Sequence, residues 1–185
     1  SAARPGPGSG EVIVSTGGGA VAAPLIEAAL AARPLSPLAA APWRILVGDN
    51  LSESQFEAYR RRAPAGVIVE RARRDFPQLL AAARLSISQA GYNTVLEVLA
   101  AGIPAVVVPF AAADETEQSL RARLLGERGA LVVVADTQLS PATLAAAVGR
   151  ALAAPRPLPG LTGLDTAGAA KTAQIVRQAA AIVGQ

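Results

Sequence analysis

The stretch RLSISQAGYNTVLEVLAAGIPAVVVP, residues 84–109, decides the fold. A short strand-like run at 84–88, which contains Leu85 and Ile87, and an apolar run at 105–109 flank a longer segment that ends at Gly102. Short apolar strands without polar alternation are typical of parallel sheets, in which strands are buried on both faces. Gly102 is well placed to end a helix in the left-handed conformation. The stretch therefore predicts two parallel strands joined by a helix.

The same alternation continues along the chain, as is typical of an α/β fold. We expect a Rossmann-like, doubly wound parallel sheet of about six strands with helices on both faces. Ser52, Asp75 and Ser140 stand where helix N-caps are expected. The predicted strands are 11–15, 43–47, 66–70, 84–88, 105–109 and 130–134, and the helices that follow them end near residues 33, 62, 83, 101, 127 and 153.

The chain of 185 residues is long enough for one domain, or for one domain with an extension. Residues 1–10 (SAARPGPGSG) have the composition of a flexible linker or a cloning remnant. Residues 11–154 are expected to form the Rossmann-like domain. Residues 155–185 are expected to form a Pro/Gly connector and a helix at 164–183 with one apolar face.

Composition excludes several kinds of site. The formal charge is only +3, and no basic stripe interleaved with aromatic residues suggests nucleic-acid binding. The chain has no Cys and no His, so the commonest general base and the commonest transition-metal ligand are absent. If this chain performs acid–base chemistry, a carboxylate must act as the base or another domain must supply it. We expect neither a metal nor a cofactor. No apolar run is long enough to span a membrane.

Ligands of doubly wound sheets bind beyond the carboxyl ends of the strands, so the strand-to-helix junctions are the candidate site. The five junctions are 16–19, 48–50, 71–75, 89–94 and 110–118.

The first junction, STGGGAV at 15–21, is rich in Gly and precedes a helix. It could hold a phosphate on free backbone amides, or be a tight turn without a ligand. Gly17, Gly19 and Ala22 also match the G-x-G-x-x-A pattern of dinucleotide-binding domains. That pattern requires an acid at the end of the second strand, but the first acid there, Asp49, comes late.

The third and fifth junctions are charged. RARRD at 71–75 brings three Arg to the carboxyl edge, either as a binding site or as a solvated loop. The acids at 114–117 suit the start of a helix, because they complement its dipole. One of these acids, together with Gln118, could instead bind sugar hydroxyls.

The fourth junction, SQAGYNTVLE at 88–97, has two interpretations. Thr94 and Glu97 have the spacing of a capping box, which would need no ligand. Capping does not explain Gly91 and Asn93, which leave a compact turn at a helix start where a phosphate could bind.

In this order the junctions resemble the C-terminal half of GT-B-fold glycosyltransferases, most closely family 28, which includes the lipid II-forming N-acetylglucosaminyltransferase. The resemblance is densest over 87–130, where the Gly turn, Thr and Glu are followed by AAGIPAVVVPF, by DETEQ and by a Gly-Ala pair. It extends more weakly over 12–153.

The resemblance implies the donor half of an inverting enzyme that transfers a hexosyl group from a UDP-sugar without a bound metal. The acceptor and the catalytic base would belong to an N-terminal domain that is not in this chain. The isolated domain would then be inactive, and its last helix would pack on that N-terminal domain. The full-length enzyme would be cytoplasmic and could associate peripherally with a membrane.

The resemblance also implies substrate-binding residues and no catalytic residue in this half. Glu97 would hold the ribose hydroxyls. Of the others, Thr16, Gly17, Gly18 and Gly19 would approach the phosphates, Ala90, Gly91, Tyr92, Asn93 and Thr94 would form the diphosphate turn, Arg71 and Ala72 would face the base, and Glu117 and Gln118 would face the sugar.

Three departures leave the base and the sugar open. The Gly-rich loop is about one residue short and lacks the Ser-Gln of the lipid II enzyme, Glu117 replaces a Gln, and Arg71 replaces an aromatic residue. The alternatives are an NAD(P)-type dinucleotide-binding domain, half of a UDP-sugar hydrolase or epimerase, and a nucleotide-binding module without activity.

Overall fold

The computed structural model describes residues 10–17, 22–110 and 116–155. The predicted helix at 164–183 lies outside these ranges, as do Gly18 and Gly19 of the Gly-rich loop.

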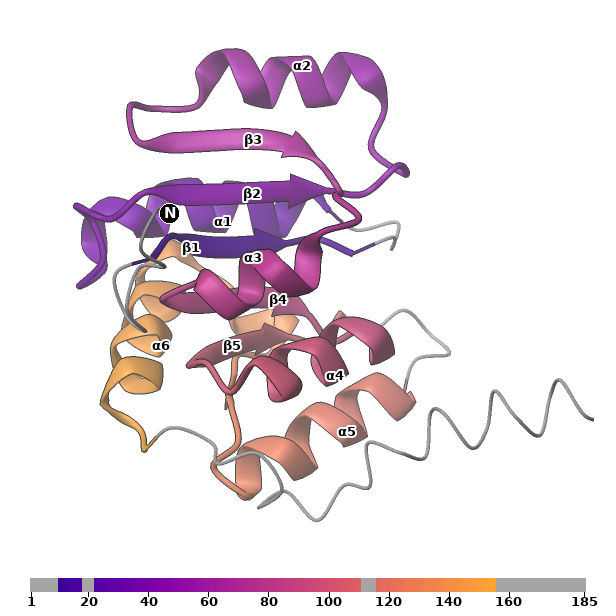
Figure 1. The fold of residues 1–185 in the computed structure, drawn as a ribbon, viewed down its shortest axis with the longest axis vertical. Helices are drawn as coiled ribbons and strands as arrows, with labels where there is room; N and C mark the ends of the chain where they lie inside the picture. Colours follow the sequence, from indigo (N-terminus) through magenta and orange to yellow (C-terminus); the bar gives the residue numbers. More distant parts are fainter. Residues whose placement is uncertain (1–9, 18–21, 111–115, 156–185) are drawn as a thin grey trace, which may run out of the picture.

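Six parallel strands form one sheet in the order β3-β2-β1-β4-β5-β6, which confirms the predicted doubly wound fold. In Figure 1 the strand arrows point to the right, so the carboxyl ends of the strands lie on that side. The strands are β1 (Val12–Ser15), β2 (Trp43–Val47), β3 (Val67–Arg71), β4 (Leu85–Gln89), β5 (Ala105–Val108) and β6 (Val132–Val133).

Helices cover both faces of the sheet, with α3, α4 and α5 in front of it and α1 and α6 behind it in Figure 1. The helix α2 lies beside the edge strand β3. The helices are α1 (Ala23–Ala32), α2 (Glu53–Arg62), α3 (Phe76–Ala82), α4 (Tyr92–Ala101), α5 (Thr116–Glu127) and α6 (Pro141–Ala153), and the 3-10 turns are η1 (Arg33–Leu35) and η2 (Asp136–Gln138).

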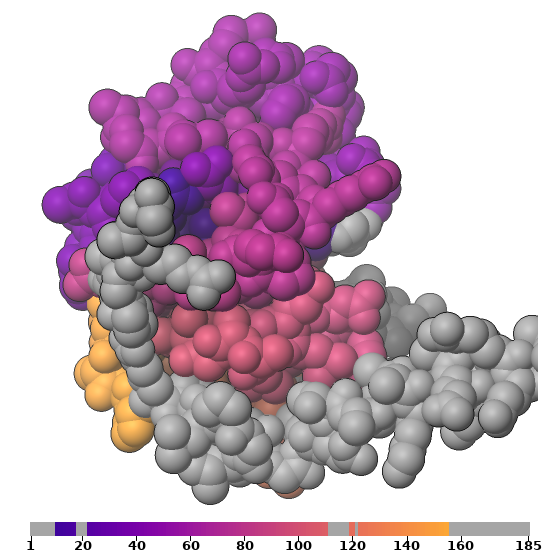
Figure 2. All heavy atoms as spheres, viewed as in Figure 1, coloured from indigo at the N-terminus to yellow at the C-terminus, as the bar shows by residue number. Residues whose placement is uncertain are grey.

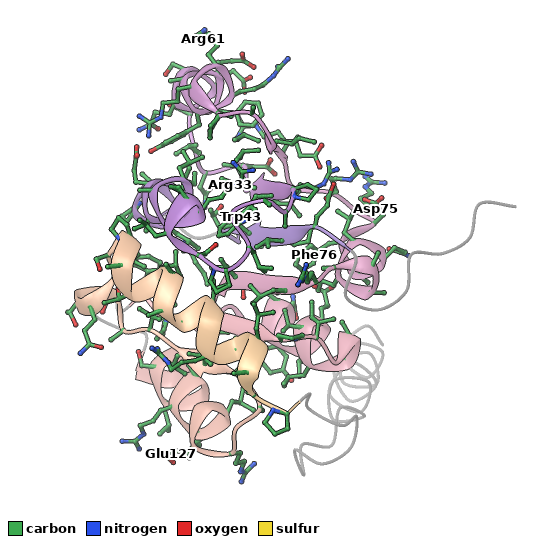
Figure 3. All side chains as sticks on the ribbon, turned by 90° about the vertical axis from the view of Figure 1, so that its left-hand side faces the viewer. Arg33, Trp43, Arg61, Asp75, Phe76 and Glu127 are labelled. Atoms are coloured by element: carbon green, nitrogen blue, oxygen red, sulfur yellow. The ribbon has the colours of Figure 1, made fainter. Side chains whose placement is uncertain are left out.

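The sheet divides the interior into two apolar clusters. Alternate residues of β1, such as Val12 and Ile13, point to opposite faces and enter different clusters. The rear cluster joins the sheet to α1, α2 and α6 and contains Trp43, which is only 1% exposed (Figure 3). The indole Nε1 of Trp43 donates a hydrogen bond to the carbonyl of Leu38 at 3.0 Å, so its one polar atom is satisfied.

Most of the predicted helix ends are confirmed. Gly102 follows α4 in the left-handed conformation, with φ of 62°. The Ser52 hydroxyl accepts from the amide of Gln55, and Ser140 forms a reciprocal capping box with Thr143 at α6.

The prediction for Asp75 is wrong in its chemistry. Asp75 stands at the N-cap of α3, but its side chain makes no cap hydrogen bond. Its two carboxylate oxygens instead accept from Arg73 Nε at 2.8 Å and Nη2 at 2.7 Å. A bidentate guanidinium contact is stronger than a bond to a neutral amide, and it takes the oxygens that a cap would use.

The predicted capping box of Thr94 and Glu97 is also wrong. The N-cap of α4 is Gly91, and no side chain caps this helix start. Thr94 is therefore already the third residue of the helix, and Glu97 lies almost a turn further along. The helix begins earlier than the spacing suggested, because the same spacing also occurs inside a helix.

A charged cluster lies where no helix covers the front of β2 and β3 (Figure 1). The Arg44 guanidinium pairs with both oxygens of Glu11, at 2.6 and 2.8 Å, and with Glu70 at 2.7 Å. The hydrogen bond from Arg44 lowers the pKa of the Glu11 carboxyl below its ordinary value of 4.5. This cluster fastens Glu11, the residue before β1, to β2 and through it to the edge strand β3.

Candidate functional site

The parallel register brings four strand ends to one edge, where they surround a pocket of about 340 Å³. In Figure 2 atoms of the segment around β3 and α3 project on this side. Its lining comes from the first four junctions: Ser15, Gly17, Leu46, Gly48, Asp49, Ala72, Arg73, Arg74, Phe76, Pro77, Thr94 and Glu97.

Gly17 forms the turn at the end of β1. Its φ of 60° is in the left-handed region, which favours Gly. A Cβ built at Gly17 would come 3.7 Å from the side-chain oxygen of Gln89. Gly17 lines the pocket, so the backbone of this turn is accessible from it.

Thr16, by contrast, is fully buried and faces the neighbouring strand. Its hydroxyl donates to the carbonyl of Leu46 and accepts from the amide of Gly48, both at 3.4 Å. The side chain thus connects the end of β1 to the end of β2. The prediction that residue 16 approaches a phosphate finds no support from this orientation of its hydroxyl.

Arg71, predicted to face the base, is held by the loop between β2 and α2. Its Nη1 donates to the carbonyls of Gly48 at 3.2 Å and of Leu51 at 3.1 Å. Its Nη2 pairs with Glu53 at 2.5 Å, and the guanidinium lies 4.2 Å from the centre of the Phe56 ring. Arg71 thus bonds to the carbonyl of Gly48 and Thr16 bonds to its amide. These bonds fix the backbone directly before Asp49.

Arg73 and Arg74 line the pocket, although the resemblance had implied only Arg71 and Ala72 from this junction. Arg73 is occupied by Asp75 and, at 3.5 Å, by Glu70. Arg74 is exposed and has no hydrogen bond or ion pair to any described residue.

The start of α4 supplies backbone donors. Val95 is the first residue whose amide bonds back, to Gly91 at 3.0 Å, so by helix geometry the preceding amides have no intrahelical acceptor. Ala90 is buried below this turn, whereas Tyr92 is 48% exposed and Asn93 is also exposed. Only Thr94 of this group lines the pocket.

Glu97 lies one turn into α4 and lines the pocket. Burial raises the pKa of its carboxyl, and no cation among the residues that the structure describes counteracts this effect. Within the described ranges Glu97 has no ion pair or hydrogen bond. A partly buried carboxylate without a partner is a strong acceptor for ligand hydroxyls.

The remaining predicted residues can be placed only in part. Glu117 and Gln118 lie in the first turn of α5, and their side chains are outside what the structure describes. Nor do the described residues include a group of three or more Asp and Glu arranged to hold a metal ion.

The resemblance assigned no role to several lining residues, notably Asp49, Phe76 and Pro77. Asp49 comes two residues after the end of β2 and reaches the pocket despite its late position. The signal for all three was their place directly after a strand or at the start of a helix at the carboxyl edge.

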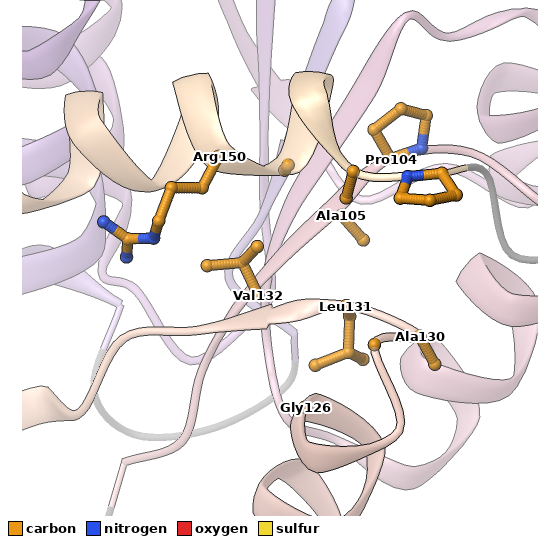
Figure 4. Close-up of a pocket in the computed structure, with 11 residues that line it drawn as sticks. Pro104, Ala105, Gly126, Ala130, Leu131, Val132 and Arg150 are labelled. Atoms are coloured by element: carbon orange, nitrogen blue, oxygen red, sulfur yellow. The ribbon is translucent and has the colours of Figure 1, made fainter.

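A second pocket, of about 260 Å³, lies at the opposite, amino edge (Figure 4). Small and apolar residues such as Pro104, Leu131 and Val132 line it, and Arg150 is the only charged side chain among them. Arg150 occupies the last turn of α6, where a cation complements the helix dipole without a ligand.

Solved glycosyltransferases share this fold. CalG4, the calicheamicin glycosyltransferase, has a TM-score of 0.63 at 27% identity, and the match covers 86% of this chain and 38% of that chain. MurG of Acinetobacter baumannii has a TM-score of 0.60 at 25% identity, with 86% and 45% covered. The fold is thus that of one Rossmann-like half of a GT-B glycosyltransferase.

The chain belongs to the family Glycosyltransferase family 28 C-terminal domain, which matches residues 12–159. Two relatives are both named UDP-N-acetylglucosamine–N-acetylmuramyl-(pentapeptide) pyrophosphoryl-undecaprenol N-acetylglucosamine transferase. The one from Desulforudis audaxviator is 37% identical over 97 residues, 52% of this chain and 26% of the relative. The one from Ralstonia nicotianae is 46% identical over 71 residues, 38% and 20%.

The chain therefore spans about a quarter or less of the length of the curated relatives it matches. Membership of a glycosyltransferase family does not favour the dinucleotide-binding alternative, even though Asp49 reaches the pocket. No helix in the described part of the chain is long and apolar enough to cross a bilayer.

Proposed function

We propose that this chain is the donor-binding half of an inverting glycosyltransferase that transfers a hexosyl group from a UDP-sugar. The observation that carries the proposal is Glu97, a carboxylate of α4 that lies in the carboxyl-edge pocket and has no partner among the described residues. The family match over 12–159 supports the nucleotide-sugar chemistry.

In this proposal Glu97 accepts hydrogen bonds from the two ribose hydroxyls. The amides at Gly91–Thr94 and the turn at Gly17 bind the diphosphate, since backbone donors and the positive end of the helix dipole favour an anion. Ala72 faces the base. Glu117 and Gln118 face the hexose.

Thr16 and Arg71 act in this proposal by positioning. Each bonds to Gly48, so together they fix the turn that carries Asp49 into the pocket. Neither needs to touch the donor to affect its binding.

The acceptor and the catalytic base are assigned to an N-terminal domain. Relatives that are several times longer than the aligned segment support this division, as does the absence of His in this chain. In the full-length enzyme residues 155–185 would return to that domain. This half alone would bind the donor without turnover.

Isothermal titration calorimetry with UDP, UDP-N-acetylglucosamine, dTDP and NAD tests the proposal. We expect UDP and the UDP-sugar to bind and NAD to bind much more weakly. Absence of UDP binding at millimolar concentration, or preferential NAD binding, would refute the proposal. Preference for dTDP would retain the site and correct the base.

A further inference from the structure

Three arginines reach the carboxyl edge in the segment RARRD, and two of them are occupied by the protein itself. Arg71 bonds to two carbonyls and to Glu53, and it stacks on Phe56. Arg73 makes a bidentate contact with Asp75. Such contacts fix a guanidinium in place and use its donors.

Arg74 differs from both. It lines the pocket and is exposed, and no described residue pairs with it. The pocket also contains the carboxylate of Glu97, but Arg74 does not neutralise it. A cation close to Glu97 would lower the pKa of its carboxyl, whereas that pKa is raised by burial alone. The pocket therefore holds a hydroxyl acceptor and a cation that do not satisfy each other.

The two groups match a ligand that carries both hydroxyls and negative charge. A nucleoside diphosphate does so, with a ribose diol and a diphosphate joined in one molecule. Guanidinium binds phosphate oxygens through paired N–H donors with a geometry that Lys cannot reproduce.

We propose that Arg74 is a specificity-determining residue that donates hydrogen bonds to the diphosphate of the nucleotide-sugar donor. The inference rests on the proposed function and adds a side-chain cation to the backbone donors of Gly17 and α4. Arg74 thereby favours a nucleoside diphosphate over the nucleoside alone.

The variant Arg74→Gln tests the inference, with Arg150→Gln as the matched control. Arg150 is also an exposed arginine that lines a pocket and has no described partner, but it lies at the amino edge (Figure 4). Binding of UDP, UMP and uridine is measured by NMR titration, with circular dichroism melting to establish that both variants are folded.

We expect Arg74→Gln to weaken UDP binding by about tenfold or more, because a charged hydrogen bond is lost, and to leave uridine binding unchanged. Arg150→Gln should bind all three ligands as the unaltered protein does. The UDP affinity of the unaltered protein should also fall more steeply with salt than that of Arg74→Gln.

Three results would overturn the inference. Unchanged UDP affinity in Arg74→Gln, with the unaltered protein binding UDP, would refute the role of Arg74 and leave the proposed function intact. Equal losses for UDP and uridine would place Arg74 at the nucleoside instead. An unaltered protein that binds no nucleoside diphosphate would refute the proposed function, and this inference with it.

Discussion

The two edges of the sheet each carry a pocket, but the pockets differ in chemistry. The amino-edge pocket is lined by small apolar side chains and one arginine that the α6 dipole accounts for. The carboxyl-edge pocket contains Gly17 in a left-handed turn, a helix start and three charged groups without described partners, Asp49, Arg74 and Glu97. A hollow of similar size becomes a candidate site only where polar groups remain available for a ligand.

This difference predicts that amino-edge substitutions change stability and carboxyl-edge substitutions change binding. The largest effect is expected for Trp43→Ala, at the first residue of β2. It removes a buried indole and its hydrogen bond, which should lower the free energy of unfolding by about 3–5 kcal/mol. Urea unfolding followed by circular dichroism measures the loss.

The milder variant Trp43→Phe keeps the experiment informative if the alanine variant does not fold. It should bind UDP with unchanged affinity. If Trp43→Phe lost as much free energy of UDP binding as free energy of unfolding, stability at the amino edge and binding at the carboxyl edge would not be independent.

The next effect concerns Glu97→Gln, compared with Glu127→Gln at the end of α5 (Figure 3). UDP binding to Glu97→Gln should weaken by about 1.5 kcal/mol or more, since a charged acceptor for the ribose hydroxyls is lost. Glu127→Gln should leave UDP binding unaltered. Calorimetry of both variants measures these affinities. If Glu97→Gln bound UDP as tightly as Glu127→Gln, Glu97 would not be part of the binding site.

The stability of Glu97→Gln gives a separate readout. The folded-state pKa of Glu97 is raised, so its stabilising effect is present at low pH and is lost as pH rises through that pKa. At neutral pH the ionised carboxylate is therefore a cost that glutamine lacks. Glu97→Gln should be as stable as the unaltered protein or more stable by up to about 0.5 kcal/mol.

A smaller effect on both properties is expected for Arg71→Met. The change removes the hydrogen bonds to Gly48 and Leu51 but keeps most of the side-chain volume. Stability should fall by about 1 kcal/mol, and UDP affinity should fall a few-fold because the turn that carries Asp49 loosens. Thermal melting and calorimetry measure the two quantities. A loss of affinity greater than that of Glu97→Gln would instead indicate direct ligand contact.

The smallest effect concerns acid stability through the Arg44 cluster. The folded-state pKa of Glu11 is lowered, so its contribution is present above the ordinary value of 4.5 and is lost as pH falls through the folded-state pKa. Arg44→Met should remove about 1 kcal/mol or less at neutral pH and flatten the loss of stability toward acid. If the free energy of unfolding fell equally with decreasing pH in both proteins, the result would contradict this prediction.

The fold could be predicted because burial on both faces leaves a strong mark in a strand. Runs such as Trp43–Val47 and Ala105–Val108 were located within a residue, and Gly102 ended α4 as expected. The predicted strand at 130–134 shortened to Val132–Val133.

The site was harder to predict. The sequence indicates that a residue lies at an edge of the sheet, but it does not indicate in which direction the side chain points. Thr16 and Arg71 both reach the carboxyl edge and then bond to Gly48. Arg73 and Arg74 are adjacent, yet Asp75 forms an ion pair with Arg73 and not with Arg74. Thr94 and Glu97 matched a capping box by spacing alone, which a helix interior also satisfies.

The most direct test of the central claim is an amide NMR titration of the labelled protein with UDP. UDP should shift amide signals grouped at the carboxyl edge, at Gly17, Gly48, Ala72 and residues 91–94. The amide signals of Gly126, Gly129 and Leu131 around the amino-edge pocket should show no systematic shift. Shifts confined to those amino-edge residues, with Gly17 and Gly91 unaffected, would contradict the central claim.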